Sequence, residues 1–179
     1  EAKDFFHTTL NYPLSNQGYY VIPPLLSMEI LKQESAYDSE LFLNNSLFRF
    51  KEIFGADLVL FTIIHKWDKS VLASNVKVKV EYIVKSTHTN NILYSRIGEI
   101  VYSTAYSSNQ AGLLGAVIDL AASAINTAAT KYVDVAKVCN GYSLYSVPFG
   151  VYHPSYQMDQ ELQVGPKEFK VRLNSQSYY

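Results

Sequence analysis

Val76-Lys-Val-Lys-Val-Glu-Tyr-Ile-Val-Lys85 decides the fold of this 179-residue chain. Apolar side chains occupy every second position from Val76 to Val84, and mostly charged side chains stand between them. Successive side chains of a β-strand point to opposite faces, so this spacing predicts a strand with one buried face and one face in water. The spacing is the clearest strand pattern in the sequence, and the flanking segments are interpreted from it.

Strand patterns also lie on both sides of this segment. Residues 57–67 contain Leu-Val-Leu-Phe-Thr-Ile-Ile, an apolar run without alternation, which predicts a central strand buried on both faces. Residues 92–106 predict another long strand, in which Gly98 is expected to mark a bulge. Turn residues at 87–91 separate the second and third strands. The three segments together predict an antiparallel meander.

Helices are expected before the meander. A short helix within residues 1–12 is predicted to end before Pro13, because the residue that precedes a proline disfavours helical backbone. Residues 25–34 predict a helix with proline at its first turn, and residues 47–54 predict one that ends at Gly55. Further strands are predicted at 19–22, 133–138 and 168–173.

Residues 109–132 carry the longest unbroken pattern and predict a helix, with Asn109 as its N-cap. Its polar residues are spaced so that they share one side: Asp119, Ser123, Asn126, Thr127 and Thr130. The rest is apolar or small, so the polar stripe is narrow. We expect the apolar flanks to be covered twice, by the sheet and by either a second helix or a partner chain. The apolar run is too short to cross a bilayer.

A candidate interface lies on the apolar flank of this helix. It consists of Leu113, Leu114, Val117, Ile118, Ala121 and Ile125. Asp119 falls on the polar stripe, where a solvated or hydrogen-bonded role is favoured over a proton relay. The flank could meet the protein's own chain or another one, and a homodimer is one form of the second case.

Length and composition predict a single α/β domain over residues 1–179, of the α+β type. We expect a mixed sheet whose antiparallel three-strand meander packs against helices, in a two-layer or three-layer sandwich. The sequence is 48% hydrophobic and 17% charged, which is typical of a globular protein. From about residue 141 it becomes rich in tyrosine and glutamine without a period, which predicts an irregular C-terminal region.

Charge and cysteine content exclude some classes of function. A net charge of −1 favours neither nucleic acid nor an anionic membrane as a partner. Lysines 77, 79 and 85 line one strand face, which we interpret as solvated. The single cysteine, Cys139, excludes an internal disulfide and is neutral on the cellular compartment.

No catalytic, cofactor or metal site is predicted. The histidines have no partner at metal-ligand spacing; they are His7, His65, His88 and His153. His65 is expected to be structural, and Asp57 to hold a turn. The sequence contains no nucleophile elbow, phosphate loop or Cys-x-x-Cys. We therefore expect a protein that is not an enzyme and that uses no cofactor.

Three segments carry a family resemblance. They are Asn11-Tyr-Pro-Leu-Ser-Asn-Gln-Gly-Tyr-Tyr-Val-Ile-Pro23, Glu52-Ile-Phe-Gly-Ala-Asp57 and Asn109-Gln-Ala-Gly-Leu-Leu-Gly115. In order and rough spacing they resemble a family of bacterial outer-membrane lipoproteins of unknown function, over about residues 3–140. The family is more distantly similar to the N-terminal domain of the Tol-system propeller protein, to the curli secretion lipoprotein and to lipoprotein activators of cell-wall synthases.

The resemblance implies an α/β sandwich without catalytic residues. It also implies lipid anchoring at the periplasmic face of the bacterial outer membrane, through a cysteine upstream of Glu1, where the family also has a first strand. The expected role is protein–protein contact with other envelope proteins in assembly, transport or secretion. A soluble periplasmic location is the alternative. The alternative function is a small-ligand or peptidoglycan-binding module with a tyrosine-lined groove, since the chain has fifteen tyrosines.

Overall fold

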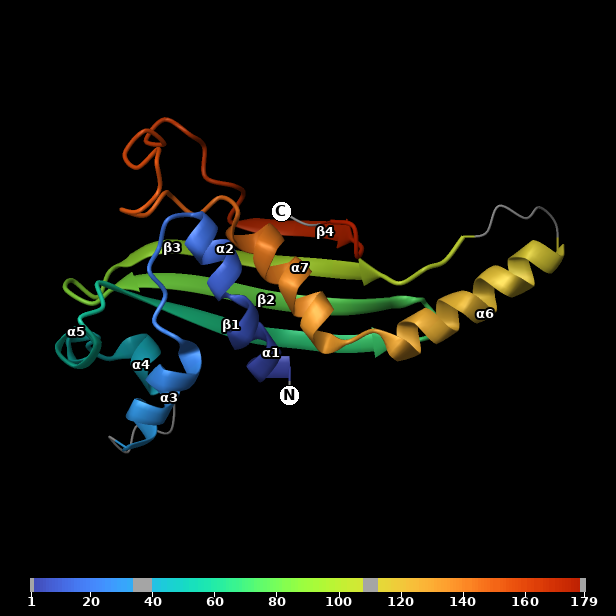
Figure 1. Ribbon diagram of the computed structural model, residues 1–179, viewed down its shortest axis with the longest axis horizontal. Coiled ribbons are helices and arrows are strands. Elements are labelled where there is room, and N and C mark those ends of the chain that lie inside the picture. Colours follow the sequence, from blue (N-terminus) through green and yellow to red (C-terminus); the bar gives the residue numbers. More distant parts are fainter. Residues whose placement is uncertain (1, 34–39, 108–112, 178–179) are drawn as a thin grey trace.

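One mixed sheet organises the computed structural model, which describes residues 2–33, 40–107 and 113–177 (Figure 1). Its strands are β1 (Leu58–Ser70), β2 (Asn75–Ser86), β3 (Ile92–Ser103) and β4 (Glu168–Leu173), in that spatial order. The first three strands form the predicted antiparallel meander. The predicted last strand pairs with β3 in parallel and lies at one edge. The expected α/β fold with a mixed sheet is confirmed.

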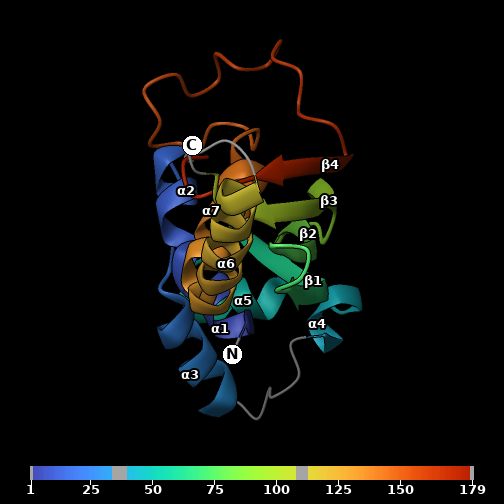
Figure 2. The ribbon, with the colours of Figure 1, turned by 90° about the vertical axis from the view of Figure 1, so that its right-hand side faces the viewer.

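The alternation in β2 is confirmed by its burial. Val76, Val80 and Tyr82 are fully buried on one face of the sheet, and Lys77 on the other face is exposed. Helices α1 (Ala2–Thr9), α2 (Asn11–Asn16) and α7 (Tyr132–Leu144) cover the buried face (Figures 1 and 2). Of the two predicted arrangements, the structure shows the two-layer one around this core.

A buried polar contact joins the helical layer to the sheet. The hydroxyl of Tyr82 donates to Asn140 Oδ1 at 2.6 Å, and Asn140 Nδ2 donates to the carbonyl of Phe6 at 2.9 Å. Both side chains lie out of contact with water, where an unpaired polar group would be costly. The contact therefore fixes α1 and α7 relative to β2.

Three local predictions are wrong for identifiable reasons. α1 confirms a short helix within residues 1–12, but Pro13 does not end the helical segment: it lies in the first turn of α2, where a missing N–H leaves no hydrogen bond unmade. Residues 19–22 are extended but pair with no strand. Residues 133–138 belong to α7, and the fully or nearly buried Val135, Ala136, Val138 and Cys139 follow helical rather than strand spacing.

The helices expected before the meander are confirmed as α3 (Pro24–Gln33) and α5 (Phe48–Phe54), with α4 (Leu41–Asn44) between them. Gly55 ends α5 with a φ of 65°, in the left-handed region that glycine adopts without strain. The carbonyl of Leu43 accepts a hydrogen bond from Lys85 Nζ at 2.7 Å. Lys85 is therefore buried, and the prediction that it lies on a solvated face is wrong.

β1 lies at an edge of the sheet, so the prediction of a central strand is wrong. Leu58, Leu60 and Ile64 pack against the core, but they are only half-buried, as are the residues between them on the opposite face. Gly98 marks no bulge, because it stands in continuous register opposite Val80; the irregular pairings lie elsewhere. Its role is to leave room for a side chain of β4, Phe169.

A buried arginine anchors the irregular residues that precede β4. Arg96 Nε donates to the carbonyl of Pro166 at 3.1 Å, and its Nη1 donates to the carbonyl of Ser143 at 3.0 Å. The guanidinium lies 4.3 Å from the centroid of the Phe169 ring, a favourable cation–π geometry. One cation thus ties together β3, the end of α7 and the approach to β4.

Candidate interaction surface

Helix α6 (Leu113–Ala129) points away from the two-layer core (Figure 1). It is attached through its polar side: Ser123 Oγ accepts a hydrogen bond from the backbone N–H of Tyr106 at 2.7 Å, and Thr127 Oγ1 contacts Thr104 Oγ1. The backbone N–H of Tyr106 needs a polar partner and Ser123 supplies it, whereas Thr127 pairs with the side-chain hydroxyl of Thr104. Ser123 and Thr127 are therefore buried, and the predicted packing of an apolar flank against the sheet is wrong.

A lysine of the sheet fixes the C-terminal end of α6. Lys69 Nζ donates to the carbonyls of Ala128 at 2.9 Å and Thr130 at 3.2 Å. The last carbonyls of a helix have no partner within the helix, and a cation there is also favourable for the helix dipole. Lys69, at the end of β1, therefore fixes the C-terminal end of α6, and the rest of the helix projects away from that point.

The predicted interface residues with described side chains share one outward flank of α6. Val117, Ala121 and Ile125 follow one another at intervals of four residues, and Ile118 stands beside them. Val117 is 58% exposed and Ile125 is 67% exposed. Leu113 and Leu114 belong to α6, but their side chains lie outside the described part of the structure, as does the predicted N-cap Asn109.

Among the residues of α6 with described side chains, part of the other side of the helix is exposed too. Leu120 stands on the same side of the helix as Ser123 and Thr127, yet it is 66% exposed. Of the two covers expected for the second flank, a helix of the same chain is therefore not found within the described residues, and a partner chain stays a prediction. Asp119 is half-buried and is the one ionisable residue in the sequence of α6. An apolar surface of this kind is typical of a contact site.

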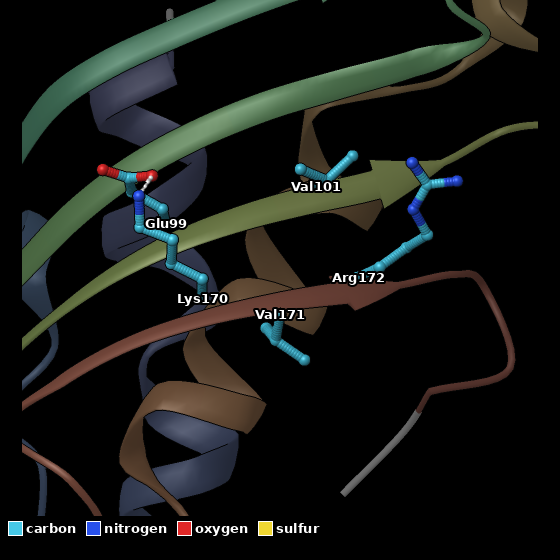
Figure 3. Close-up of a pocket in the computed structure, with 5 residues that line it drawn as sticks. All are labelled: Glu99, Val101, Lys170, Val171 and Arg172. Carbon is cyan, nitrogen blue, oxygen red and sulfur yellow. Dashed lines mark ion pairs between the residues drawn. The ribbon is translucent and has the colours of Figure 1, made fainter.

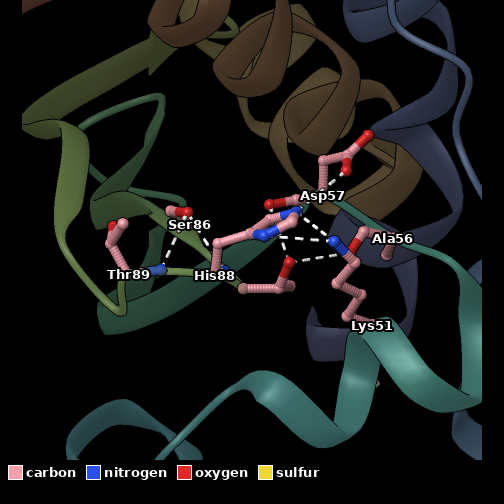
Figure 4. A network of polar contacts seen from close by, with 7 residues as sticks. Lys51, Ala56, Asp57, Ser86, His88 and Thr89 are labelled. Atoms are coloured by element: carbon pink, nitrogen blue, oxygen red, sulfur yellow. Dashed lines mark hydrogen bonds and ion pairs between the residues drawn. The ribbon is translucent and has the colours of Figure 1, made fainter.

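A polar network surrounds the turn between β2 and β3 (Figure 4). Lys51 Nζ lies 3.1 Å from His88 Nδ1, and His88 Nε2 lies 3.5 Å from Asp57 Oδ1. Thr87 Oγ1 donates to the carbonyl of Ala56 at 2.8 Å and to that of Asp57 at 3.0 Å. The network thus joins α5 and the start of β1 to the hairpin, the turn-holding role expected for Asp57.

Two further residues with titratable side chains have structural surroundings. His65 Nε2 lies 2.9 Å from Glu81 Oε2, a partner of the kind expected for a structural histidine. Burial raises the pKa of the Cys139 thiol far above its usual value, which keeps it protonated and unreactive. In the described ranges no group of three histidine, cysteine or carboxylate side chains could hold a metal ion.

Tyrosines gather where two distant segments meet. Gln17 Nε2 donates to the carbonyl of Tyr145 at 2.9 Å, and the backbone N–H of Tyr152 donates to the carbonyl of Gly18 at 3.1 Å. These segments expose Tyr12, Tyr20, Tyr145, Tyr152 and Tyr156. A shallow pocket at β3 and β4 contains no tyrosine, so the tyrosine-lined groove stays a prediction.

Comparison with known proteins places the chain among lipoproteins. A family model described as "Putative lipoprotein GNA1162-like" matches residues 1–148. The crystal structure of lipoprotein GNA1162 from Neisseria meningitidis is similar, with 22% sequence identity and a TM-score of 0.47, over 69% of this chain and 84% of that chain. No curated protein matches the chain. Among the helices that the structure describes, none is long and apolar enough to cross a bilayer.

Proposed function

Because the chain belongs to the GNA1162-like lipoprotein family, we propose that it is the periplasmic domain of an outer-membrane lipoprotein that works through protein–protein contacts. The family match confirms the resemblance found in the three sequence segments. The proposed role is non-enzymatic and lies in envelope assembly, transport or secretion. Lipid at an upstream cysteine would hold the domain at the periplasmic face.

The exposed flank of α6 is the observation that carries this proposal. Val117, Ile118, Ala121 and Ile125 face away from the groups that attach the helix. Fully burying one aliphatic side chain contributes about 1.5–3 kcal/mol, so a partner that covers the three larger ones would gain several times RT. The partner side of this contact is apolar, because the flank offers no charge to pair.

A second copy of the chain is the partner that this flank fits most simply. Ala121 and Ala128 are seven residues apart, so they leave a low strip along which another helix can approach closely. Two such flanks are alike and uncharged, so a two-fold contact between them places apolar side chains against apolar side chains. Other envelope proteins with an apolar helix could use the same flank.

Sedimentation velocity across a range of protein concentrations tests this contact. We expect the wild type to dimerise in the micromolar range and the variant Val117→Lys with Ile125→Lys to remain monomeric. Val151→Lys with Leu162→Lys is the matched control, because both residues are similarly exposed but lie in the irregular C-terminal region. A wild type that stays monomeric at high micromolar concentration, or a control that also loses the dimer, would contradict α6 as the homodimer face.

A further inference from the structure

The sheet face opposite α1, α2 and α7 carries two rows of charged residues that cross all four strands. Residues directly opposite each other on neighbouring strands share a face of the sheet. The first row is Lys66, Lys79, Glu99 and Lys170; the second is Asp68, Lys77, Val101 and Arg172. Within these two rows five cations stand against two carboxylates; the adjacent row of the same face adds Glu81, which pairs with His65, and Glu168.

Three of these cations have no acidic partner among the described residues. Lys170 Nζ pairs with Glu99 Oε2 at 2.8 Å, and Lys66 Nζ lies 3.8 Å from Asp68 Oδ2. Those two contacts use both carboxylates of the rows. Lys77 and Arg172 are exposed and Lys79 is half-buried; none of the three forms an ion pair among the described residues, although Lys77 stands opposite Asp68 and Lys79 opposite Glu99.

One pair in this arrangement is unfavourable for the sheet, whereas Asp68 opposite Lys77 and Glu99 opposite both Lys79 and Lys170 are favourable pairs. Lys66 stands directly opposite Lys79, and like charges in that position destabilise a pair of strands. Lys77 and Lys79 also lie two residues apart on the same face of β2. The position of these side chains in water does not require cations, because uncharged polar side chains would be solvated equally well. A bound anion would compensate the repulsion.

The surface is open rather than enclosed (Figure 3). A shallow pocket between β3 and β4 is lined by Glu99, Val101, Lys170, Val171 and Arg172. Figure 3 shows Lys170 turned to Glu99 and the guanidinium of Arg172 lying apart from them. Strands stand about 4.8 Å apart, so the two rows spread their cations over roughly 14 Å by 7 Å. Such a flat grid fits many anionic groups in a plane better than one small enclosed anion.

We propose that this basic face binds the phosphates of anionic lipid headgroups in the membrane to which the protein is anchored. The idea rests on the anchoring in the proposed function, because a tether holds the face at a high effective concentration of headgroups. Lysine acts as a flexible point charge toward phosphate, and Arg172 adds a fork of donors. The face would hold the domain against the bilayer and leave α6 free for its partner.

Vesicle co-sedimentation of the soluble 179-residue chain tests the proposal without any lipid anchor. We expect binding to vesicles of phosphatidylcholine mixed with phosphatidylglycerol, but little binding to phosphatidylcholine vesicles. Binding should fall as salt rises from about 0.05 to about 0.3 M, because the shorter Debye length screens the cations. Added inorganic phosphate at matched ionic strength should not compete, since a single anion spans only part of the grid.

The variant Lys77→Gln, Lys79→Gln, Arg172→Gln should weaken binding to anionic vesicles by about tenfold or more. Lys3→Gln, Lys131→Gln, Lys137→Gln is the matched control, because it removes the same charge from exposed residues elsewhere. Lys3 lies on α1, Lys137 on α7, and Lys131 between α6 and α7. This variant should bind nearly as well as the wild type. Equal loss in both triple variants, equal binding to both vesicle types, or binding only to acidic proteins would overturn the proposal. These outcomes do not depend on the α6 contact, which sedimentation velocity tests separately.

Discussion

The smallest residue of β3 decides whether β4 can dock. A Cβ atom added to Gly98 would lie 2.1 Å from Phe169 Cζ, far inside contact distance. The ring occupies the place that any other residue would fill, so glycine is required here for space rather than for backbone freedom. The guanidinium of Arg96 also lies 4.3 Å from the centroid of this ring.

Gly98→Ala should therefore lower the free energy of unfolding by about 1–3 kcal/mol, the usual cost of overpacking. Phe169→Ala should also destabilise the protein. In the double variant the new methyl group would fill part of the space that the ring has left. The double variant should then lose about 1 kcal/mol less unfolding free energy than the two single variants lose in sum. Urea unfolding of the four proteins measures this difference.

Gly141→Ala is the control for this cycle. Gly141 lies inside α7, and no atom lies within 4 Å of the position of an added Cβ. Alanine favours helix over glycine, so this change should stabilise the protein by about 0.5–1 kcal/mol. If Gly98→Ala proved equally harmless, the contact between Gly98 and Phe169 would be wrong.

Among the secondary-structure elements, β4 closes the sheet on the side of β3. It lies beyond residues 1–148, the part of the chain that matches the family model. Its six residues include Glu168, Lys170 and Arg172, and short charged edge strands resist pairing with other chains. The longer β3 beneath it has no such protection once β4 is removed.

Removal of residues 167–179 should therefore expose the edge of β3. We expect the truncated chain to lose about 2 kcal/mol or more of unfolding free energy, through lost hydrogen bonds and the lost Phe169 ring, and to aggregate as concentration rises. Light scattering and urea unfolding measure the two effects. Removal of residues 175–179 keeps β4 and should change neither property; equal aggregation of both truncated chains would contradict the role given to β4.

The sequence pattern predicted elements well where one period dominated. β2 and the meander follow from strict alternation, and α5 follows from its glycine end. Residues 133–138 were ambiguous, because β-branched residues favour strands whereas burial in α7 follows helical spacing. The apolar run of β1 did not reveal its edge position, which depends on strand order. The attachment of α6 by Ser123 and Thr127 depends on the backbone N–H of Tyr106 and the hydroxyl of Thr104, which no local pattern reveals.

At the scale of the whole molecule, stability depends on the docking of α1 against α7 and β2. His7 lies on α1, and burial, followed by the nearby charge of Lys3, lowers its pKa below 6.5; Asp4 opposes the shift. The unfolded chain therefore binds a proton at this residue before the folded protein does. As the pH falls through the interval below 6.5, protonation favours the unfolded state.

The urea midpoint of the wild type should thus decrease between pH 7 and pH 5.5, and the variant His7→Gln should show a smaller decrease over the same interval. Below the pKa of His7 in the folded protein the contribution of this residue becomes constant. Urea titrations in buffers of equal ionic strength measure both trends. An identical pH dependence in the two proteins would show that His7 does not couple folding to protonation.

The parallel pairing of β3 with β4 sets an order of events while the chain is being made. Ile97 stands opposite Glu168, about 70 residues later in the sequence. At a synthesis rate of about 5–20 residues per second, β3 emerges on the order of ten seconds before its neighbour exists. The meander must wait that long with one edge unpaired, and the closure of so long a loop makes docking of β4 a late step. Until β4 docks, the open edge of β3 can pair with strands of neighbouring chains, so slow passage of residue 168 during synthesis or export would prolong the interval of misassembly.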